Sequence, residues 1–223
     1  MAKFTIVFHS VCGNTYQIAD CFYRVLQERG QEVALYRTAD ASFESGERRS
    51  DEFKHLQAAI DAVPVIEEAA QVLGSDVLLL GSPTYYGCVS AQMKTFMDSF
   101  EKMWADAPTA GMYFGCFTSA GDGCGGPELC LQVMNTFAQH MGMVPISVPC
   151  NIGGTAQPAY GIKHVSGEKA DRAVTEETQT AGSKELCGPY SESHFIRGRK
   201  RRKDTQFSGK DVLFYDISKK GLN

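Results

Sequence analysis

The chain has 223 residues, of which 43% are hydrophobic and 22% are charged, and its formal net charge is −4. These values are typical of one globular domain, and so small a charge favours neither a nucleic-acid-binding protein nor a membrane-surface protein. The longest strongly apolar run, after Asp76, is far too short to span a bilayer, and the N-terminus lacks the pattern of a signal peptide, so we expect a cytoplasmic protein without a membrane span.

Short apolar runs alternate with helical patterns along the first two thirds of the chain. The runs predict strands over residues 4–8, 32–36, 77–80, 113–117 and 145–149. Apolar residues at helical spacing predict helices over 15–29, 90–104 and 127–141, and a helix over 50–73 that breaks at Pro64. Strands that alternate with helices predict an α/β fold, with a parallel sheet and helices on both faces.

The last third of the chain changes in composition. Residues 151–174 are rich in glycine, alanine and polar residues and are predicted to form a long loop, with a short helix over 176–187. Residues 188–223 carry nine Lys and Arg against four Asp and Glu, a charge of +5, which leaves −9 for the rest. We therefore divide the chain into a domain over 1–187 and a basic extension over 188–223.

The basic extension admits three interpretations. The run at 197–203 is almost entirely Lys and Arg, and it suits either binding of a nucleic acid or another acidic partner, or a solvated arm, which is the commoner case. The apolar run at 211–217 predicts a strand that packs on a neighbouring subunit or extends the sheet.

Eight cysteines are scattered through the chain, and none forms a C-x-x-C pair. This spacing argues against a zinc knuckle or a clustered iron–sulfur site, and a cytoplasmic chain of this size is not expected to contain disulfides. Cys12, Cys88 and Cys124 fall in polar loops, and the sequence leaves undecided whether any of these three is redox-active. Cys12 or Cys124, near a helix N-terminus and loop amides, would suit a redox sensor.

Three polar, glycine-rich loops follow the strands at 4–8, 77–80 and 113–117. They are HSVCGNT (9–15), GSPTYYGCVS (81–90) and TSAGDGCGG (118–126). In an open α/β sheet, ligands bind beyond the carboxyl ends of the strands where the strand order reverses. The three loops are therefore predicted to meet at one ligand site.

The first loop has the character of a phosphate site. It offers the side chains and amides of Ser10, Val11, Cys12, Gly13, Asn14 and Thr15 at the start of a helix, where an anion is favoured. It lacks the lysine of a P-loop and the three glycines of a Rossmann loop, so it suits a single phosphate monoester such as that of FMN. The alternative is a polar turn that only caps the helix.

The second and third loops suit a flat ring. Pro83, Thr84, Tyr85, Tyr86 and Gly87 place two aromatics and backbone groups at a strand end. Ser119, Ala120, Gly121, Asp122, Gly123 and Gly125 form a segment whose backbone can approach a ligand closely and donate to its carbonyls. The alternatives are tyrosines packed on their own loop and a glycine-rich surface turn.

The segment PTYYGCVSAQMKTFMDSF resembles the second flavin loop and following helix of the WrbA-type NAD(P)H:quinone oxidoreductases, in the flavodoxin-like superfamily. The family pattern is roughly P-T-R-F-G-N-x-x-G-Q-M-R-x-F-x-D, matched here by Pro83, Thr84, Gly87, Gln92, Met93, Phe96 and Asp98. SAGDGCGGPE resembles its S-T-G-x-G-G-G-x-E, and FAQHMGMVPI its A-H-H-G-M. The first loop is more similar to flavodoxin itself, S-V-C-G-N-T against T-x-T-G-N-T.

The resemblance implies a flavodoxin-like, doubly wound, five-stranded parallel sheet in the order 2-1-3-4-5. It implies bound FMN and a ping-pong cycle in which NADH or NADPH reduces the flavin and a quinone or similar small acceptor reoxidises it. It also implies a homodimer or homotetramer with active sites completed between subunits. Trp104 and His140 match residues at the family's substrate face and are candidate catalytic residues, although a packed core position is the alternative for each.

Departures from the family pattern concern the substrate side more than the flavin. Tyr85 stands where the family has arginine, Cys88 replaces asparagine and Cys12 replaces tyrosine or threonine. The loss of the arginine removes a positive charge near the flavin, which bears on acceptor choice and redox potential. The competing interpretation is a flavodoxin-type electron carrier without NAD(P)H-dependent activity of its own, and the first loop favours it.

Overall fold

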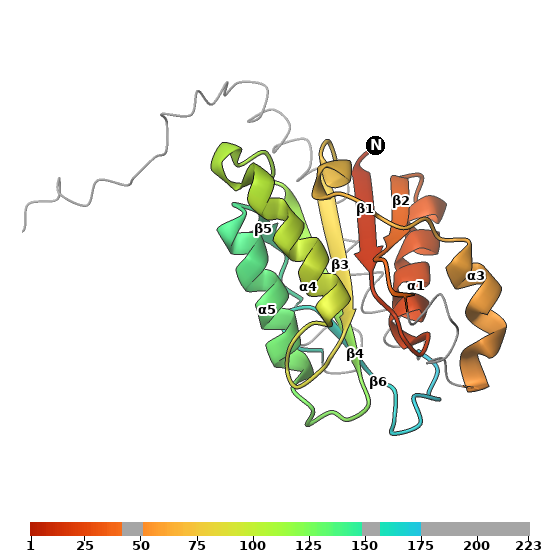
Figure 1. Ribbon diagram of the computed structural model, residues 1–223. Coiled ribbons are helices and arrows are strands. Elements are labelled where there is room, and N and C mark those ends of the chain that lie inside the picture. Colours follow the sequence, from red (N-terminus) through yellow and green to blue (C-terminus); the bar gives the residue numbers. More distant parts are fainter. Residues whose placement is uncertain (42–50, 149–156, 175–223) are drawn as a thin grey trace, which may run out of the picture.

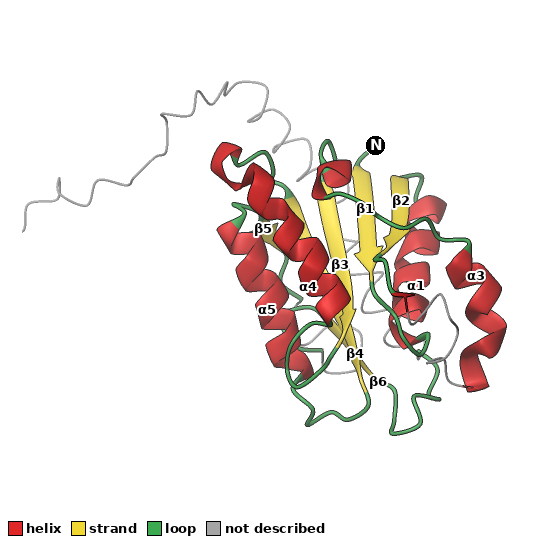
Figure 2. Ribbon diagram, in the orientation of Figure 1, coloured by secondary structure: helices red, strands yellow, loops and turns green. Residues whose placement is uncertain are grey.

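A parallel sheet in the order β2-β1-β3-β4-β5 forms the centre of the molecule (Figures 1 and 2). The structure is a computed structural model, and it describes residues 1–41, 51–148 and 157–174. The strands are β1 (Lys3–Phe8), β2 (Glu32–Arg37), β3 (Val77–Pro83), β4 (Tyr113–Ala120), β5 (Val144–Pro145) and β6 (Ile162–Val165). This arrangement confirms the predicted doubly wound α/β fold and its strand order.

The fifth position of the sheet is shared by β5 and β6, which both pair with β4. β5 pairs with the start of β4 at Tyr113 and Phe114, and β6 pairs with its end over residues 117–120. The prediction that residues 151–174 form only a loop is therefore wrong at 162–165. The sequence of β6 is only four residues long and contains Lys163 and His164, so nothing in its local pattern distinguishes it from a loop.

The gap between β5 and β6 is covered by the chain that leads into β6. The Sγ of Cys116 donates to the carbonyl of Tyr160 across 3.2 Å. Gly161 lies so close to β4 that a Cβ atom on it would be 2.4 Å from the carbonyl oxygen of Cys116, which no side chain could tolerate. A glycine is therefore needed where the second half of the fifth position begins.

Helices pack on both faces of the sheet (Figure 1). They are α1 (Asn14–Glu28), α3 (Gln57–Asp61), α4 (Ala91–Asp98) and α5 (Pro127–His140), with 3₁₀ turns η1 (Asp51–Leu56), η2 (Ala69–Val72) and η3 (Ser99–Asp106). The predicted helix over 50–73 is interrupted after Asp61, because the backbone at Pro64 and Ile66 turns extended and hydrogen-bonds to Arg37 at the end of β2. The prediction of a break at Pro64 is confirmed.

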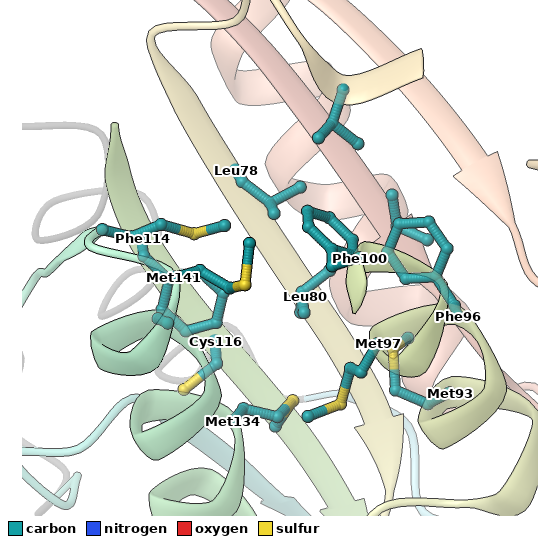
Figure 3. Close-up of a cluster of buried hydrophobic side chains, with 14 of the residues drawn as sticks. Leu78, Leu80, Met93, Phe96, Met97, Phe100, Phe114, Cys116, Met134 and Met141 are labelled. Atoms are coloured by element: carbon teal, nitrogen blue, oxygen red, sulfur yellow. The ribbon is translucent and has the colours of Figure 1, made fainter. Parts of the chain in front are cut away.

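Two hydrophobic clusters separate the sheet from its helices. Under α1 the cluster is aromatic, and the rings of Phe22 and Phe117 lie 5.4 Å apart between their centroids. Under α4 and α5 it is rich in methionine (Figure 3). Its buried members include Leu78, Leu80, Met93, Phe96, Met97, Phe100, Phe114, Cys116, Met134 and Met141. Strands buried on both faces explain why their sequences are continuous apolar runs.

Several predictions concern residues outside the described ranges. These are the helix over 176–187, the strand over 211–217, the basic run at 197–203 and the boundary between the domain at 1–187 and the extension at 188–223. Within the described ranges, no helix is long and apolar enough to cross a membrane.

Candidate functional site

An open cleft lies at the carboxyl ends of β1, β3, β4 and β6. Its walls come from the three predicted loops and from a fourth segment after β6. The lining residues are Ser10, Val11, Cys12, Asn14, Thr15, Pro83, Thr84, Tyr85, Ser119, Ala120, Gly121, Ser166, Gly167, Glu168 and Ala170. The structure thus brings the three predicted loops together at the predicted edge of the sheet.

The first loop turns sharply from β1 into α1. Gly13 precedes the helix with a φ of 102°, a left-handed conformation that favours glycine. The Oγ of Ser10 accepts hydrogen bonds from the amides of Gly13 and Tyr16, each 3.2 Å away. The amides of Asn14 and Thr15 lie between these two, in the first turn of the helix, where backbone N–H groups have no acceptor within the helix. The loop therefore has the form of an anion site.

Hydroxyl pairs connect the three loops at the wall of the cleft. Thr15 Oγ1 lies 2.7 Å from the Oγ of Ser119, which joins the first loop to the third. Thr84 Oγ1 lies 2.7 Å from Thr118 Oγ1, and the amide of Thr84 donates to the carbonyl of Ser119 across 2.8 Å, which joins the second loop to the third. The buried polar side chains thus hold the loops in one arrangement.

The second loop ends in a tight turn that projects an aromatic ring. Tyr85 and Cys88 exchange two backbone hydrogen bonds of 2.9 Å, and the two residues between them both have positive φ, 52° at Tyr86 and 76° at Gly87. A positive φ is unfavourable for tyrosine, and strain of this kind is often found at functional sites. The side chain of Tyr86 is fully exposed, and that of Tyr85 is 37% exposed at the cleft wall.

The third loop is organised by its own acidic residue. Asp122 Oδ1 accepts a hydrogen bond of 2.7 Å from the amide of Cys124, and its carbonyl accepts one from the amide of Gly125. These bonds direct the carboxylate and both amides into the loop. Only the first part of this loop, Ser119–Gly121, lines the cleft.

A buried network supports the cleft from below and was not predicted. His9 Nε2, at the end of β1, lies 2.9 Å from Asp40 Oδ2. The other carboxylate oxygen of Asp40 accepts a hydrogen bond of 3.0 Å from the side-chain amide of Gln92, near the start of α4. The network joins the ends of β1, β2 and α4. Of its three members only Gln92 carried a sequence signal, as part of the family motif.

The fourth segment, Ser166–Ala170, was also missed. It continues directly from β6, because the amide of Ser166 donates to the carbonyl of Ala120 across 2.8 Å. At its far end, Asn14 Nδ2 donates to the carbonyl of Ala170 across 3.0 Å. This contact joins residues 156 positions apart in the sequence, so no local pattern could have revealed it.

The titratable groups around the cleft are few. Glu168 is the only formally charged side chain among the lining residues that the structure describes. Burial raises the pKa of the Cys130 thiol below the second loop, although hydrogen bonds from Thr118 and Thr84 oppose this effect. Burial also lowers the pKa of His164 on β6, whose Nε2 lies 2.9 Å from the carbonyl of Arg172. Both groups are therefore held in their neutral forms near pH 7.

Trp104 and His140 do not lie at the cleft of their own chain. Trp104 is in η3 and His140 ends α5, and both segments lie at the amino ends of the strands, opposite the cleft (Figure 1). The side chain of Trp104 is 63% exposed and His140 is exposed too, so neither is a packed core residue.

Eleven of the predicted cofactor-binding residues line the cleft and six do not. Those outside its lining are Gly13, Tyr86, Gly87, Asp122, Gly123 and Gly125, all of which form the turns that shape the first three loops. Of the three cysteines singled out, Cys12 is half-buried in the lining, while Cys88 and Cys124 are exposed beside it.

Comparisons with known proteins agree with this geometry. The family model described as NADPH-dependent FMN reductase matches residues 6–156. Among curated relatives, a NAD(P)H dehydrogenase (quinone) of Methanosarcina barkeri is 29% identical over 79% of this chain and 89% of its own length. Another of the same name from Methanosarcina mazei is 32% identical over 67% of this chain and 73% of its own length.

A solved structure shares the fold. The flavodoxin, WrbA-like protein from Agrobacterium tumefaciens superposes with a TM-score of 0.53 and 20% identity, over 90% of this chain and 99% of that one. At this level of identity the likeness concerns the fold alone.

Proposed function

This chain belongs to the NADPH-dependent FMN reductase family, and from that membership and the geometry of the cleft we infer that it is an FMN-dependent oxidoreductase that takes electrons from NAD(P)H. We propose further that FMN binds across the three loops at the strand ends and that a quinone or similar small molecule accepts the electrons. The curated relatives named NAD(P)H dehydrogenase (quinone) support this acceptor class.

The first loop fits the phosphate of FMN. The first-turn amides of Asn14 and Thr15 are available to an anion, and Gly13 supplies the left-handed backbone conformation with which the helix begins. The hydroxyl of Thr15, which is 1% exposed, is fixed by its bond to Ser119. No lysine or arginine lines the described part of the cleft, which suits one phosphate monoester better than a di- or triphosphate.

The second and third loops fit the flavin ring. Pro83, Thr84 and Tyr85 would border one side of it, and the backbone of Ser119–Gly121 would border another. Bound FMN supplies a ring that accepts a hydride from NADH or NADPH and then reduces a two-electron acceptor. The loops would hold that ring at an open cleft, which a donor and an acceptor could enter in turn.

We also propose a homodimer or homotetramer in which one subunit completes the site of another. Trp104 and His140 match positions at the family's substrate face, yet within one chain they lie at the far end of the sheet from the cleft. A second copy is the means by which these exposed side chains would reach a cleft. If Trp104→Ala leaves both the oligomer size and the KM for quinone unchanged, this part of the proposal is wrong.

A cytoplasmic location is part of the same proposal. The cysteines that the structure describes are not joined by disulfides, as is usual in a reducing compartment.

An anaerobic titration of the FMN-loaded protein tests the proposed function. NADH and NADPH are added separately and the visible absorption of the bound flavin is followed; a quinone is then added. We expect rapid bleaching by one or both donors and recovery of the colour with quinone. Flavin that binds but is reduced only by a chemical reductant would instead identify an electron carrier. Failure to bind flavin would reject the assignment of the cleft.

A further inference from the structure

The fourth segment of the cleft, Ser166–Ala170, has no role in the function proposed so far. Its placement is fixed by contacts with the first and third loops. The amide of Ser166 and its Oγ both donate to the carbonyl of Ala120, across 2.8 and 3.2 Å. A Cβ on Gly121 would lie 3.4 Å from the carbonyl oxygen of Gly167, so the two backbones are close neighbours.

The far end of the segment is pinned to the start of α1. The carbonyl of Ala170 accepts a hydrogen bond of 3.0 Å from Asn14 Nδ2. This bond sets the orientation of the Asn14 amide, because a flipped amide would place its oxygen against the carbonyl of Ala170. The structure therefore fixes which end of the Asn14 side chain is an acceptor.

That acceptor is unsatisfied. Asn14 is 4% exposed and lines the cleft, and its Oδ1 has no hydrogen-bond partner among the described residues. A buried polar atom without a partner is costly, so a ligand group that supplies a donor would bind favourably there. Phosphate oxygens are acceptors and cannot serve this atom near neutral pH, whereas a hydroxyl group can.

Glu168 adds a second acceptor to the same wall. Its side chain is exposed, lines the cleft and forms no hydrogen bond or ion pair with any described residue. A carboxylate repels a phosphate dianion but accepts strong hydrogen bonds from hydroxyls. Asn14 Oδ1 and the Glu168 carboxylate thus both favour a ligand group that donates hydrogen bonds, such as a hydroxyl.

We propose that Ser166–Ala170 is a fourth cofactor-binding loop, which recognises the hydroxyls of the ribityl chain of FMN through Asn14 Oδ1 and the carboxylate of Glu168. The inference rests on the proposed function, since it assumes that the cleft holds a flavin. It divides the recognition of one ligand: the first-turn amides of α1 bind the phosphate, the second and third loops border the ring, and the fourth loop binds the polyol between them.

Three ligands separate these contributions. Lumiflavin has only the ring, riboflavin adds the ribityl hydroxyls, and FMN adds the phosphate. The dissociation constants of all three are measured by fluorescence titration of the flavin-free protein, for the wild type, Asn14→Ala, Glu168→Ala and Lys169→Ala. Lys169 is the matched control, because it is an exposed charged neighbour in the same segment that does not line the cleft.

We expect Asn14→Ala and Glu168→Ala each to weaken riboflavin binding by roughly three- to tenfold, as for the loss of one hydrogen bond to a ligand. Lumiflavin binding should not change, and Lys169→Ala should behave as the wild type with lumiflavin and riboflavin. Because Glu168 is exposed, Glu168→Ala should fold as the wild type does. The thermal unfolding of each flavin-free variant checks that it is folded.

Other results would overturn the inference. Equal losses for lumiflavin and riboflavin would mean that the segment acts only on the shape of the site. Unchanged riboflavin binding with weaker FMN binding would mean that this wall contacts the phosphate. A wild type that binds none of the three ligands would reject the proposed function itself. A wild type that binds flavin, with variants that still bind riboflavin as tightly as the wild type does, would reject only the fourth loop's role.

Discussion

The methionine-rich cluster under α4 and α5 and the cleft at the strand ends both contain buried side chains, but they differ in what surrounds those side chains. In the cluster, side chains such as Met93, Met134 and Phe114 are fully buried and surrounded by other apolar groups of the same chain (Figure 3). In the cleft, many of the buried side chains are polar. Thr15 and Ser119 pair with each other, while Asn14 keeps an acceptor without a partner.

This difference indicates a division of tasks. The cluster stabilises the fold by removing apolar surface from water, and it is complete without a ligand. The cleft contributes less apolar burial, and its hydrogen bonds fix loop positions against one another. Substitutions in the cluster should therefore lower stability without changing which flavin is preferred, whereas substitutions in the cleft should change flavin binding and lower stability less. The following experiments test that separation.

The largest effect is expected in the cluster. Met134→Ala would leave a cavity between α5 and the sheet, and the free energy of unfolding should fall by about 2–5 kcal/mol. Urea unfolding measures this change. Gln132→Ala, at an exposed position of the same helix, is the control and should change stability by less than about 0.5 kcal/mol. If Met134→Ala also altered the FMN-to-riboflavin preference of the folded protein, the two regions would not be separate.

An intermediate effect is expected from the hydroxyl pair of the cleft. Thr15→Val or Ser119→Ala alone leaves a buried hydroxyl without its partner, which costs about 1–3 kcal/mol of stability. The double variant removes both hydroxyls, so its loss should be smaller than the sum of the two single losses. Thermal unfolding of the three variants gives the coupling.

The same double variant separates stability from binding. Because Thr15 also belongs to the phosphate side of the cleft, FMN affinity should stay low even where stability recovers. Full recovery of both in the double variant would contradict the role given to this hydroxyl.

A smaller effect is expected from pH. Burial, with a lesser contribution from the charge of Arg172, lowers the pKa of His164 below its ordinary value of about 6.5. The unfolded chain then binds a proton at a higher pH than the folded protein does. The stability tied to neutral His164 is present above about pH 6.5 and is lost as the pH falls toward the lowered pKa of the folded state.

Urea unfolding at a series of pH values from 7.5 to about 5 tests this expectation. His164→Gln should flatten the decline in stability on the acid side. His140→Gln, at an exposed position, should leave it as in the wild type. An unchanged slope in His164→Gln would show that His164 does not titrate differently in the two states.

The smallest effect concerns thiol accessibility. Cys88 and Cys124 are exposed beside the cleft, whereas Cys116 and Cys130 are buried in the cluster and their pKa values are raised by burial. A thiol reagent followed by peptide mapping should modify the first pair rapidly and the second pair only on unfolding. Fast modification of Cys130 in the native protein would show that the cluster opens toward the second loop.

The parts of the molecule that the sequence predicted share a local signal. β1, β3 and β4 are continuous apolar runs, and the loops after them contain glycine and small polar residues, so their meeting at one edge follows from parallel topology. The eleven predicted residues that line the cleft belong to these loops. The six that do not line it form the turns, because a pattern of glycines identifies a turn without showing which of its residues face a ligand.

The parts that were missed depend on contacts between distant segments. β6 is recognised as a strand only by its pairing with the end of β4, and the fourth segment enters the cleft only because β6 is in that place. The network of His9, Asp40 and Gln92 joins three elements that are far apart in the sequence. Short polar segments of this kind have no periodicity of their own, so residue patterns cannot place them.

The split of the fifth position into β5 and β6 divides the pairing of this side of β4 between two short strands. Each half fixes its own register on β4, so the number of residues between Pro145 and Ile162 is not set by the ladder on either side. The described ends of that connection are held in place all the same, because Ile146 and Val148 are buried in the core and Gly161 packs against Cys116. The pairing of β6 with the end of β4 places the wall that follows it, so a change of register in β6 would move Ser166–Ala170 while β5 keeps its partners.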